Sequence, residues 1–507
     1  MPFHFQFARR VWLLLATALL LSPNCTFAAE PSPTRKPNII FFIADDLGYG
    51  DVGYLGQKKI HTPNIDRLAA EGIQFTHHYA GSPVCAPSRC VLMTGKHSGH
   101  SFIRNNREMK PEGQFPIPAD TVTVAKLLKQ NGYVTGAFGK WGLGGPESAG
   151  RPLKQGFDRF YGYNCQYVAH NLFPTYLWDN EQRVNLNNPA LDYDQKLPTD
   201  ADPKNQDNYK AFTGKEYAPD LYAEQALRFI RNNKDKPFFL FFPTVTPHLA
   251  LQVPEDSLKE YEGKFPETPY VGGRGYLPQR APHAAYAAMI TRMDRDLGRM
   301  VALIKELNLD NDTIIIFTSD NGSAPQDLGG TDAKFFNSSG PFRSGKGSIY
   351  EGGMREPLVV RWHGKIKPGT TSEQVTGFED WLPTLLELVG KKDAVPSGID
   401  GISFAPILFG GKVPDRPFLY REFPAYGGQQ AIRVGDWKAV RQNLKPAGKA
   451  KPNLHIELYD LKSDIAESHD VSAEHPEIVA KLDTLMRKEH VPSKNFPFPA
   501  LDQMSIK

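Results

Sequence analysis

Four residues whose side chains offer oxygen donors stand in two adjacent pairs, Asp45 with Asp46 and Asp320 with Asn321. Carboxylate and amide oxygens suit a hard divalent cation such as calcium or magnesium, and not zinc. Taken singly, Asp46 could cap a helix and Asn321 could form a tight turn with Gly322. Three carboxylates packed together would repel one another or bind protons unless a cation were present. The two pairs therefore predict a metal site if the fold brings them together.

A lysine and a histidine also stand just after apolar runs. Lys140 follows residues 134–138, and His248 follows residues 238–245. Imidazole can donate a proton at neutral pH because its ordinary pKa is near 6.5. A lone histidine after a strand is more often structural and a loop lysine is usually solvated. Their positions beside the acidic pairs favour a functional role for both.

Four runs rich in β-branched and aromatic residues precede these side chains, as is typical of strands buried on both faces of a parallel sheet. The runs are 38–44, 134–138, 238–245 and 313–318. Segments with helical spacing lie between or beside them, at 64–71, 121–130, 221–232 and 284–305. This alternation predicts an α/β fold. Ligands of such sheets bind beyond the carboxyl ends of the strands, so we expect the charged side chains to gather at that edge.

The pattern changes after about residue 410. Four short strands are expected at 418–423, 430–434, 437–441 and 455–460, followed by a helix at 476–488. A small antiparallel sheet with one helix across it is the simplest interpretation. We therefore predict a catalytic domain over residues 29–410 and a C-terminal subdomain over residues 411–507.

The first 28 residues have the pattern of a secretory signal peptide. A basic start is followed by the apolar run Val11–Leu21, which is too short to span a membrane, and by small residues at Ala28 and Ala29. Lipidation at Cys25 is the less favoured alternative, because the two residues before that cysteine suit it poorly. The sequence predicts a periplasmic or secreted protein without a membrane span in its mature chain.

Composition excludes two classes of protein. The formal net charge is only +3, which argues against nucleic acid as a partner. Three cysteines remain after cleavage, Cys85, Cys90 and Cys165, far too few for a disulfide scaffold. Core packing must hold the protein together, and 507 residues supply enough apolar surface for it.

The segment Cys85–Gly95, C-A-P-S-R-C-V-L-M-T-G, matches the signature C-x-P-S-R-x-x-x-[LM]-T-G of type I sulfatases. With D-D-L-G after the first predicted strand and D-N-G after a later one, the chain resembles this family from Pro37 to beyond Glu457. Within the family it resembles bacterial arylsulfatases and N-acetylgalactosamine-6-sulfatase-like carbohydrate sulfatases. The resemblance implies the alkaline-phosphatase-like fold and hydrolysis of a sulfate ester, on a sulfated carbohydrate, to an alcohol and inorganic sulfate.

The resemblance also implies a modified nucleophile. Cys85 would be oxidised by a formylglycine-generating or equivalent maturation enzyme, and one hydroxyl of the hydrated aldehyde would attack sulfur. One calcium ion would be held by Asp45, Asp46, Asp320 and Asn321, with residue 85 completing the shell.

Three cations and an acid follow from the same resemblance. Arg89 in the signature, Lys140 in G-K-W and Lys346 in G-K-G-x-x-x-E-G-G match positions that stabilise charge developing on the sulfate. His248, in T-P-H, matches the histidine that protonates the departing alcohol oxygen.

One departure from the family leaves a role open. Many members have G-K-W-H-L-G where this chain has Gly142 in place of the histidine, which is proposed to help release sulfate. The base that would reset the nucleophile is therefore not assigned. His97, His100 and His170 are candidates, and each could equally contact substrate or cap a turn.

An aromatic segment is the candidate for sugar recognition. His170 and Asn171 lie in it and are, with His100, the candidate substrate-binding residues; the aromatic members are Tyr161, Tyr163, Tyr167, Tyr176 and Trp178. These rings could stack on a sugar at the leaving-group side of the pocket, or they could be core. Two other functions stay open at this point: a phosphoesterase or phosphonate hydrolase of the same fold, and a protein that binds sulfated glycan without turnover.

Overall fold

The computed structural model describes residues 35–448 and 450–504. The chain divides into two units, Met1–Lys36 and Pro37–Lys507, and the fold below is that of the second unit. The predicted signal peptide and Cys25 lie outside the described residues.

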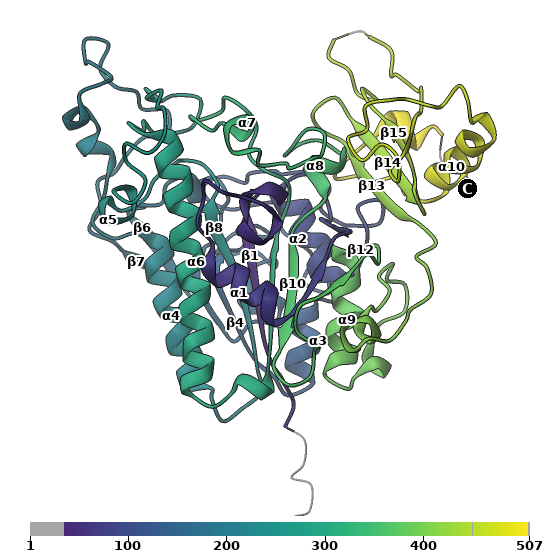
Figure 1. The fold of residues 1–507 in the computed structure, drawn as a ribbon, viewed down its shortest axis with the longest axis horizontal. Helices are drawn as coiled ribbons and strands as arrows, with labels where there is room; N and C mark the ends of the chain where they lie inside the picture. The colour runs from purple at the N-terminus through teal and green to yellow at the C-terminus, as the bar shows by residue number, and fades with distance from the viewer. Residues whose placement is uncertain (1–34, 449, 505–507) are drawn as a thin grey trace, which may run out of the picture. The chain divides into compact units, whose positions relative to one another are not determined.

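A ten-stranded sheet forms the centre of this unit, in the order β11-β2-β10-β9-β1-β8-β4-β5-β6-β7 (Figure 1). The strands are β1 (Asn38–Asp45), β2 (Ile73–Phe75), β4 (Val134–Lys140), β5 (Arg159–Tyr163), β6 (Tyr176–Asp179), β7 (Gln182–Asn185), β8 (Phe238–Pro247), β9 (Thr313–Ser319), β10 (Leu358–Trp362) and β11 (Thr370–Ser372). The neighbours β9, β1, β8, β4 and β5 are all parallel. The predicted α/β class is confirmed, and the four predicted strands β1, β4, β8 and β9 lie side by side.

Each face of the sheet is covered by helices because both faces of its central strands are apolar. In β1, Ile40 and Phe42 point into one core, and Ile39 and Phe41 point into the other. The first core also takes residues from α1 (Pro63–Glu71), α4 (Ala218–Asn232) and α6 (Pro282–Glu306), and the second from α2 (Cys85–Thr94), α3 (Val124–Gln130) and α9 (Trp381–Leu388), as Figure 1 shows. Burial of each such side chain contributes about 2 kcal/mol to folding.

The edges of the sheet differ from its centre. Strand β10 runs antiparallel to β9 and β2, and β6 pairs antiparallel with β5 and β7. The fifth parallel strand, β5, was not predicted, because it lies in the segment that was interpreted only as aromatic. The other short strands and α-helices, apart from those near the C-terminus described next, are β3 (His78–Tyr79), β12 (Thr376–Gly377), α5 (Glu255–Leu258), α7 (Ala333–Phe336), α8 (Glu351–Met354) and α11 (Pro499–Asp502).

A second sheet follows near the C-terminus. Its antiparallel strands are β13 (Leu419–Phe423), β14 (Gln429–Val434), β15 (Trp437–Arg441) and β16 (Glu457–Asp460). Helix α10 (Pro476–Lys488) buries Leu482 and Met486 against Tyr420 and Ile432 of this sheet. The predicted antiparallel subdomain thus exists as a sheet with a helix, while its boundary at residue 410 stays a prediction. Among the residues that the structure describes, no helix has both the length and the apolar character needed to cross a membrane.

Candidate active site

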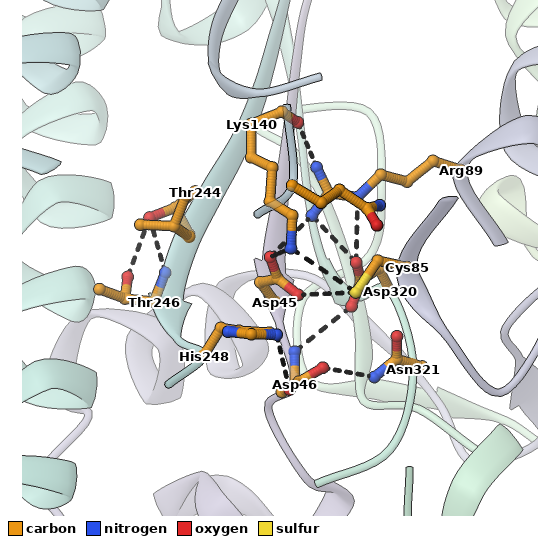
Figure 2. A network of polar contacts seen from close by, with 12 residues as sticks. Asp45, Asp46, Cys85, Arg89, Lys140, Thr244, Thr246, His248, Asp320 and Asn321 are labelled. Carbon is orange, nitrogen blue, oxygen red and sulfur yellow. Dashed lines mark hydrogen bonds and ion pairs between the residues drawn. The ribbon is translucent and has the colours of Figure 1, made fainter. Parts of the chain in front are cut away.

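The carboxyl ends of the four predicted strands bring their polar side chains to one place (Figure 2). Asp45 ends β1 and Lys140 ends β4, while His248 and Asp320 directly follow β8 and β9. Cys85, the first residue of α2, joins them: its Sγ lies 3.4 Å from Asp45 Oδ1 and 3.6 Å from Lys140 Nζ. The parallel sheet is therefore the reason that residues far apart in the chain meet around one cysteine.

Hydroxyl groups fix the end of β8 just before the histidine. Tyr222 of α4 hydrogen-bonds to Thr244 at 2.7 Å and accepts the backbone N–H of Val245 at 3.1 Å. Thr244 in turn bonds to Thr246 at 2.9 Å, as Figure 2 shows. These buried hydrogen bonds between hydroxyl groups fix the conformation of the end of β8 and so the position of His248, which follows it.

The fully buried Arg89 side chain links the acidic residues to one another. Its Nε and Nη2 donate to Asp320 Oδ2 at 3.0 and 2.9 Å, and Nη2 lies 3.3 Å from Asp45 Oδ2. Its Nη1 donates to the Lys140 carbonyl. The neighbouring Ser88 hydroxyl donates to the Asp320 carbonyl at 2.6 Å. The signature helix α2 is thereby bonded to the ends of three strands.

Asp46 is the meeting point of the other charged groups. Its backbone is left-handed, with φ of 64°, which turns the side chain away from the line of the strand. Asn321 Nδ2 donates to its Oδ1 at 2.7 Å, and Lys346 Nζ donates to its Oδ2 at 2.7 Å. His248 Nε2 lies 3.5 Å from the same Oδ2, and the other ring nitrogen, Nδ1, lies 2.6 Å from the Leu249 carbonyl.

Burial and charge act differently on the three carboxyl groups. Burial raises the pKa of Asp46, and burial with the nearby Asp45 charge raises the pKa of Asp320 to about 7. Burial also opposes ionisation of Asp45, but the charges of Lys140, His248 and Arg89 outweigh it and hold its pKa far below the usual value. The protein's own cations thus neutralise only part of the cluster.

The donor set fits a hard divalent cation. Asp45, Asp46, Cys85 and His248 each place one potential ligand atom within 4.8 Å of the others. Asn321 Oδ1 is buried and has no hydrogen-bond partner among the described residues, although its Nδ2 is fully used. The amide oxygen is buried next to carboxyl groups whose pKa is raised. A calcium or magnesium ion would bind this oxygen and stabilise the charged form of those carboxyl groups.

The cysteine itself is a poor nucleophile in its unmodified form. Burial and the Asp45 charge raise the pKa of the Cys85 thiol to about 12, so the thiol is protonated at neutral pH. Only a thiolate attacks efficiently.

His170 lies at the site, and Asn171 lies beside it. The His170 ring stacks on His248 with 5.1 Å between ring centroids, and its centroid lies 5.2 Å from that of the Tyr276 ring. The Asn171 side chain instead accepts the backbone N–H of Phe173 at 3.0 Å and closes a turn. The buried Nδ1 of His170 has no hydrogen-bond partner among the residues described.

His97 and His100 form a separate cluster. Their rings stack at 4.1 Å, and His100 Nδ1 lies 2.9 Å from Asp400 Oδ1. His97 Nε2 lies 3.3 Å from Glu489 Oε2, while its Nδ1 accepts the Gly99 N–H. His100 also borders a surface pocket of about 530 Å³ that contains none of the strand-end residues. The proposed substrate role of His100 stays a prediction, and its contacts here are to Asp400.

The aromatic segment divides between the site and the core. Tyr167 contacts the His170 ring, at 5.5 Å between centroids. Tyr176 and Trp178 donate to Glu112 at 2.8 and 2.7 Å, and Tyr161 and Tyr163 are buried in the first core. Tyr276, from outside the segment, was not predicted, because nothing local marks a tyrosine that only the fold brings to His170.

Gln166 was not predicted either. A side-chain atom built on Gly142 would lie 2.8 Å from Gln166 Nε2. The glycine where the family often has histidine was the available signal, but the partner that fills the space belongs to the unpredicted connection after β5.

A buried cluster of carboxylates, two lysines and an arginine at the carboxyl edge of a parallel sheet is the site of an enzyme that binds an anionic substrate. Comparison with known proteins identifies which class. Residues 37–391 match the family model described as Sulfatase, and residues 344–491 match the model described as N-sulphoglucosamine sulphohydrolase, C-terminal. The chain belongs to the sulfatase family, and it is a sulfuric ester hydrolase.

Individual relatives agree with this assignment. The chain is 31% identical to N-acetylgalactosamine-6-sulfatase of Canis lupus familiaris, over 84% of this chain and 75% of that protein. It is 32% identical to arylsulfatase A of Homo sapiens, over 90% and 88% of the two chains. The solved structure of Ps i-CgsB in complex with k-i-k-neocarrahexaose superposes with a TM-score of 0.71 at 28% identity, covering 89% of this chain and 92% of that one.

Proposed function

We propose that this sulfatase removes sulfate from a carbohydrate, using formylglycine at position 85 and one calcium ion. The observation that carries the proposal is the placement of Cys85, the first residue of the sulfatase signature, against Asp45 and Lys140 at the sheet edge. As a hydrate, formylglycine supplies a hydroxyl nucleophile where the buried thiol would be inert. A maturation enzyme would be required to make it.

Four side chains would hold the calcium ion: Asp45, Asp46, Asp320 and Asn321. When bound, the ion would neutralise these carboxylates and polarise oxygens of the nucleophile and of the sulfate. The orphaned Asn321 Oδ1 and the raised pKa of Asp46 and Asp320 support this donor set.

Three fixed cations would act on the sulfate group. Lys140 Nζ lies between Asp45 and Cys85 and can reach an oxygen of a group attached at residue 85. Lys346 approaches the same pocket from the Asp46 side. Arg89 holds the carboxylates in place and carries positive charge beneath them. Fixed donors of this kind stabilise charge that develops in the transition state.

His248 would protonate the departing alcohol. Its Nδ1 faces a backbone carbonyl and therefore carries the ring proton, which leaves Nε2 as the nitrogen that faces the pocket. Burial and the charges of Lys346 and Lys140 lower the pKa of His248 well below its ordinary value, so the protonated ring would need a bound sulfate group to pair with those lysines. The proton at Nε2 would then pass to the alcohol oxygen as the ester bond breaks.

A carbohydrate substrate is supported by the relatives and by the rings beside His248. One relative is named for a sulfated sugar, N-acetylgalactosamine-6-sulfatase, and the similar structure of Ps i-CgsB was solved in complex with k-i-k-neocarrahexaose. Here Tyr167, His170 and Tyr276 form an aromatic wall next to the proposed acid, where a sugar face can stack. Action on an extracellular or periplasmic glycan fits the predicted signal peptide.

The test begins with protein made together with a formylglycine-generating enzyme. The mass of the tryptic peptide 68–89 should show conversion of Cys85, and the protein should release sulfate from sulfated oligosaccharides. The Cys85→Ala variant should not. Unmodified Cys85 throughout an active preparation would refute the mechanism, and faster turnover of matched phosphate esters would favour the phosphoesterase alternative.

A further inference from the structure

Lys346 lies in an irregular segment between α7 and α8, so contacts from other parts of the chain must fix its backbone. Its own N–H donates to the carbonyl of Ser323, in the loop that follows β9, at 2.9 Å. The N–H of the next residue, Gly347, donates at 2.8 Å to the carbonyl of Pro83, two residues before α2 begins. The segment is thereby attached to two elements that form the candidate active site.

A third attachment comes from the C-terminal sheet. Gln429, the first residue of β14, donates from Nε2 to the Gly347 carbonyl at 2.7 Å and accepts the Ile349 N–H at Oε1, at 2.9 Å. Gln442 Nε2 also donates to this Oε1, at 3.3 Å, and Gln429 is only 3% exposed. One buried amide therefore holds the backbone on both sides of Ser348.

The alternation of side chains along β14 directs Gln429 toward this segment. Successive side chains of a strand point to opposite faces of the sheet. Ala431, on the same face as Gln429, packs in one hydrophobic cluster with Ile349. Gln430 is buried on the other face, where it donates to the carbonyl of Met486 in α10 at 2.9 Å. The two neighbouring glutamines thus hold different elements.

The turn before β14 restricts the same backbone. Gly347 has φ of +83°, in the left-handed region that favours glycine. A Cβ atom on it would lie 2.5 Å from two ring carbons of Tyr426, in the turn between β13 and β14. The C-terminal sheet therefore both hydrogen-bonds and covers the residue next to Lys346.

We propose that Gln429 is a positioning residue for Lys346. By holding the backbone around Gly347, it would fix the lysine ammonium group against Asp46 and the sulfate. The proposal rests on the proposed function, which gives Lys346 its role on the sulfate group. A misplacement of about 1 Å at a reacting centre can cost about 100-fold in rate, and side chains on loops need supporting contacts to reach such precision.

Two neighbouring variants separate positioning from folding. Gln429→Met leaves the buried Gly347 carbonyl and Ile349 N–H without this partner, and we expect kcat/KM on 4-nitrophenyl sulfate to fall about tenfold or more. Gln430→Met, the matched control, removes a buried amide of the same strand that holds α10. Both variants should lower the thermal midpoint, but kcat/KM of Gln430→Met, measured below its midpoint, should stay close to the wild-type value.

A milder variant covers the case in which Gln429→Met folds poorly. Gln429→Asn keeps an amide, but its shorter side chain cannot reach both Gly347 and Ile349. Its kcat/KM should fall in the same direction. Wild-type kcat/KM in the folded Gln429 variants would overturn the proposal.

A double-mutant cycle tests whether the effect passes through the lysine. If it does, Gln429→Met should lower kcat/KM much less in a Lys346→Met background than in the wild type, because the group that it positions is already absent. A general structural role predicts the same fold loss in both backgrounds. That result would count against a positioning role for Gln429.

Failure of the proposed function would be recognised separately. Hydrogen exchange of the peptide that contains residues 344–349, followed by mass spectrometry, reports on the segment without turnover. Exchange should be faster in Gln429→Met than in wild type and unchanged in Gln430→Met. Faster exchange in Gln429→Met, with no sulfate ester hydrolysed by the wild type, would refute the proposed reaction and leave Gln429 as the residue that holds the Lys346 segment. Normal turnover, with exchange and kcat/KM unaffected by the Gln429 variants, would do the reverse.

Discussion

The Lys346 ammonium donates a 2.7 Å hydrogen bond to Asp46 Oδ2, although 300 positions separate the two residues in the chain. The ion pair links the loop before α8 to the end of β1, and both side chains are largely buried. Lys346 also keeps its own pKa well above the usual value, because the attraction of Asp46 outweighs burial. It is therefore a fixed positive charge at the proposed sulfate site.

Removing this charge should impair turnover. Lys346→Met is expected to lower kcat/KM by about 100-fold or more, the range for loss of one fixed donor to a charged transition state. The matched control is Lys365→Met, at an exposed lysine after β10, whose end pairs with the start of β9 at the opposite edge of the sheet; it should retain wild-type activity. The measurement is kcat/KM of both variants on one sulfate ester. Equal activity of the two variants would exclude Lys346 from the site.

Chelation should remove activity and stability together. A chelator is expected to abolish sulfate release, and added calcium should restore it. A ligand present at 100 times its Kd stabilises the folded protein by about 2.7 kcal/mol, so calcium should raise the thermal midpoint by a measurable amount. Asp320→Asn and Asn321→Ala should lose most of this shift. A midpoint that ignores calcium in the wild type would contradict the proposed ion.

The effect of His248 should depend on the leaving group. His248→Gln is expected to lower kcat about 100-fold or more on a sulfated sugar, where an alkoxide needs a proton to depart. On 4-nitrophenyl sulfate, whose phenolate leaves without a proton, the loss should be much smaller. The ratio of the two rates, measured for wild type and variant, is the readout. An equal loss on both esters would mean that the histidine does not act as the acid.

A second histidine, His78, should make the fold sensitive to acid. It is fully buried, and its Nε2 accepts the Trp381 indole N–H at 3.4 Å while its Nδ1 faces the Thr376 hydroxyl at 2.9 Å. Protonation would break the tryptophan contact. Burial lowers the pKa of His78 to about 3, and the attraction of Glu379 does not offset it.

The sign of the pH effect follows from this lowered pKa. Below about pH 6.5 the unfolded chain binds a proton at this histidine, whereas the folded protein binds it only near pH 3. The free energy of unfolding therefore decreases as the pH is lowered from about 6.5 to about 3. At pH 5 the loss from this one group is about 2 kcal/mol. Arg416 and Arg421 lie nearby and also disfavour the charged ring.

Replacing the ring should flatten this dependence. His78→Gln is expected to be less stable than wild type at pH 7, and the difference should shrink toward pH 5. His363→Gln, at an exposed position, is the control and should follow the wild-type curve. Denaturant midpoints at three pH values provide the measurement. A constant difference between His78→Gln and wild type would remove His78 as a source of acid sensitivity.

The four central strands and the main candidate site residues could be predicted from the local sequence. The runs before Asp45, Lys140, His248 and Asp320 are apolar on both faces, and only a strand covered on both sides can bury them. Because parallel strands end at the same edge, their following side chains were predictable as neighbours. The signature from Cys85 added the proposed nucleophile. Neither β5 nor β10 was predicted, and the antiparallel direction of β10 could not be, because strand pairing depends on long-range contacts.

The sequence alone determined that this chain is a large α/β protein with the sulfatase signature, since those properties reside in local pattern and residue type. Only the tertiary structure decided which of the spare histidines joins His248. The His100 ring faces Asp400 and the His97 ring faces Glu489, whereas the His170 ring stacks on His248 at the site. It also decided that Gln166 fills the space beside Gly142. Such contacts depend on where two loops meet in space, and the spacing of residues along the chain does not reveal which loops meet.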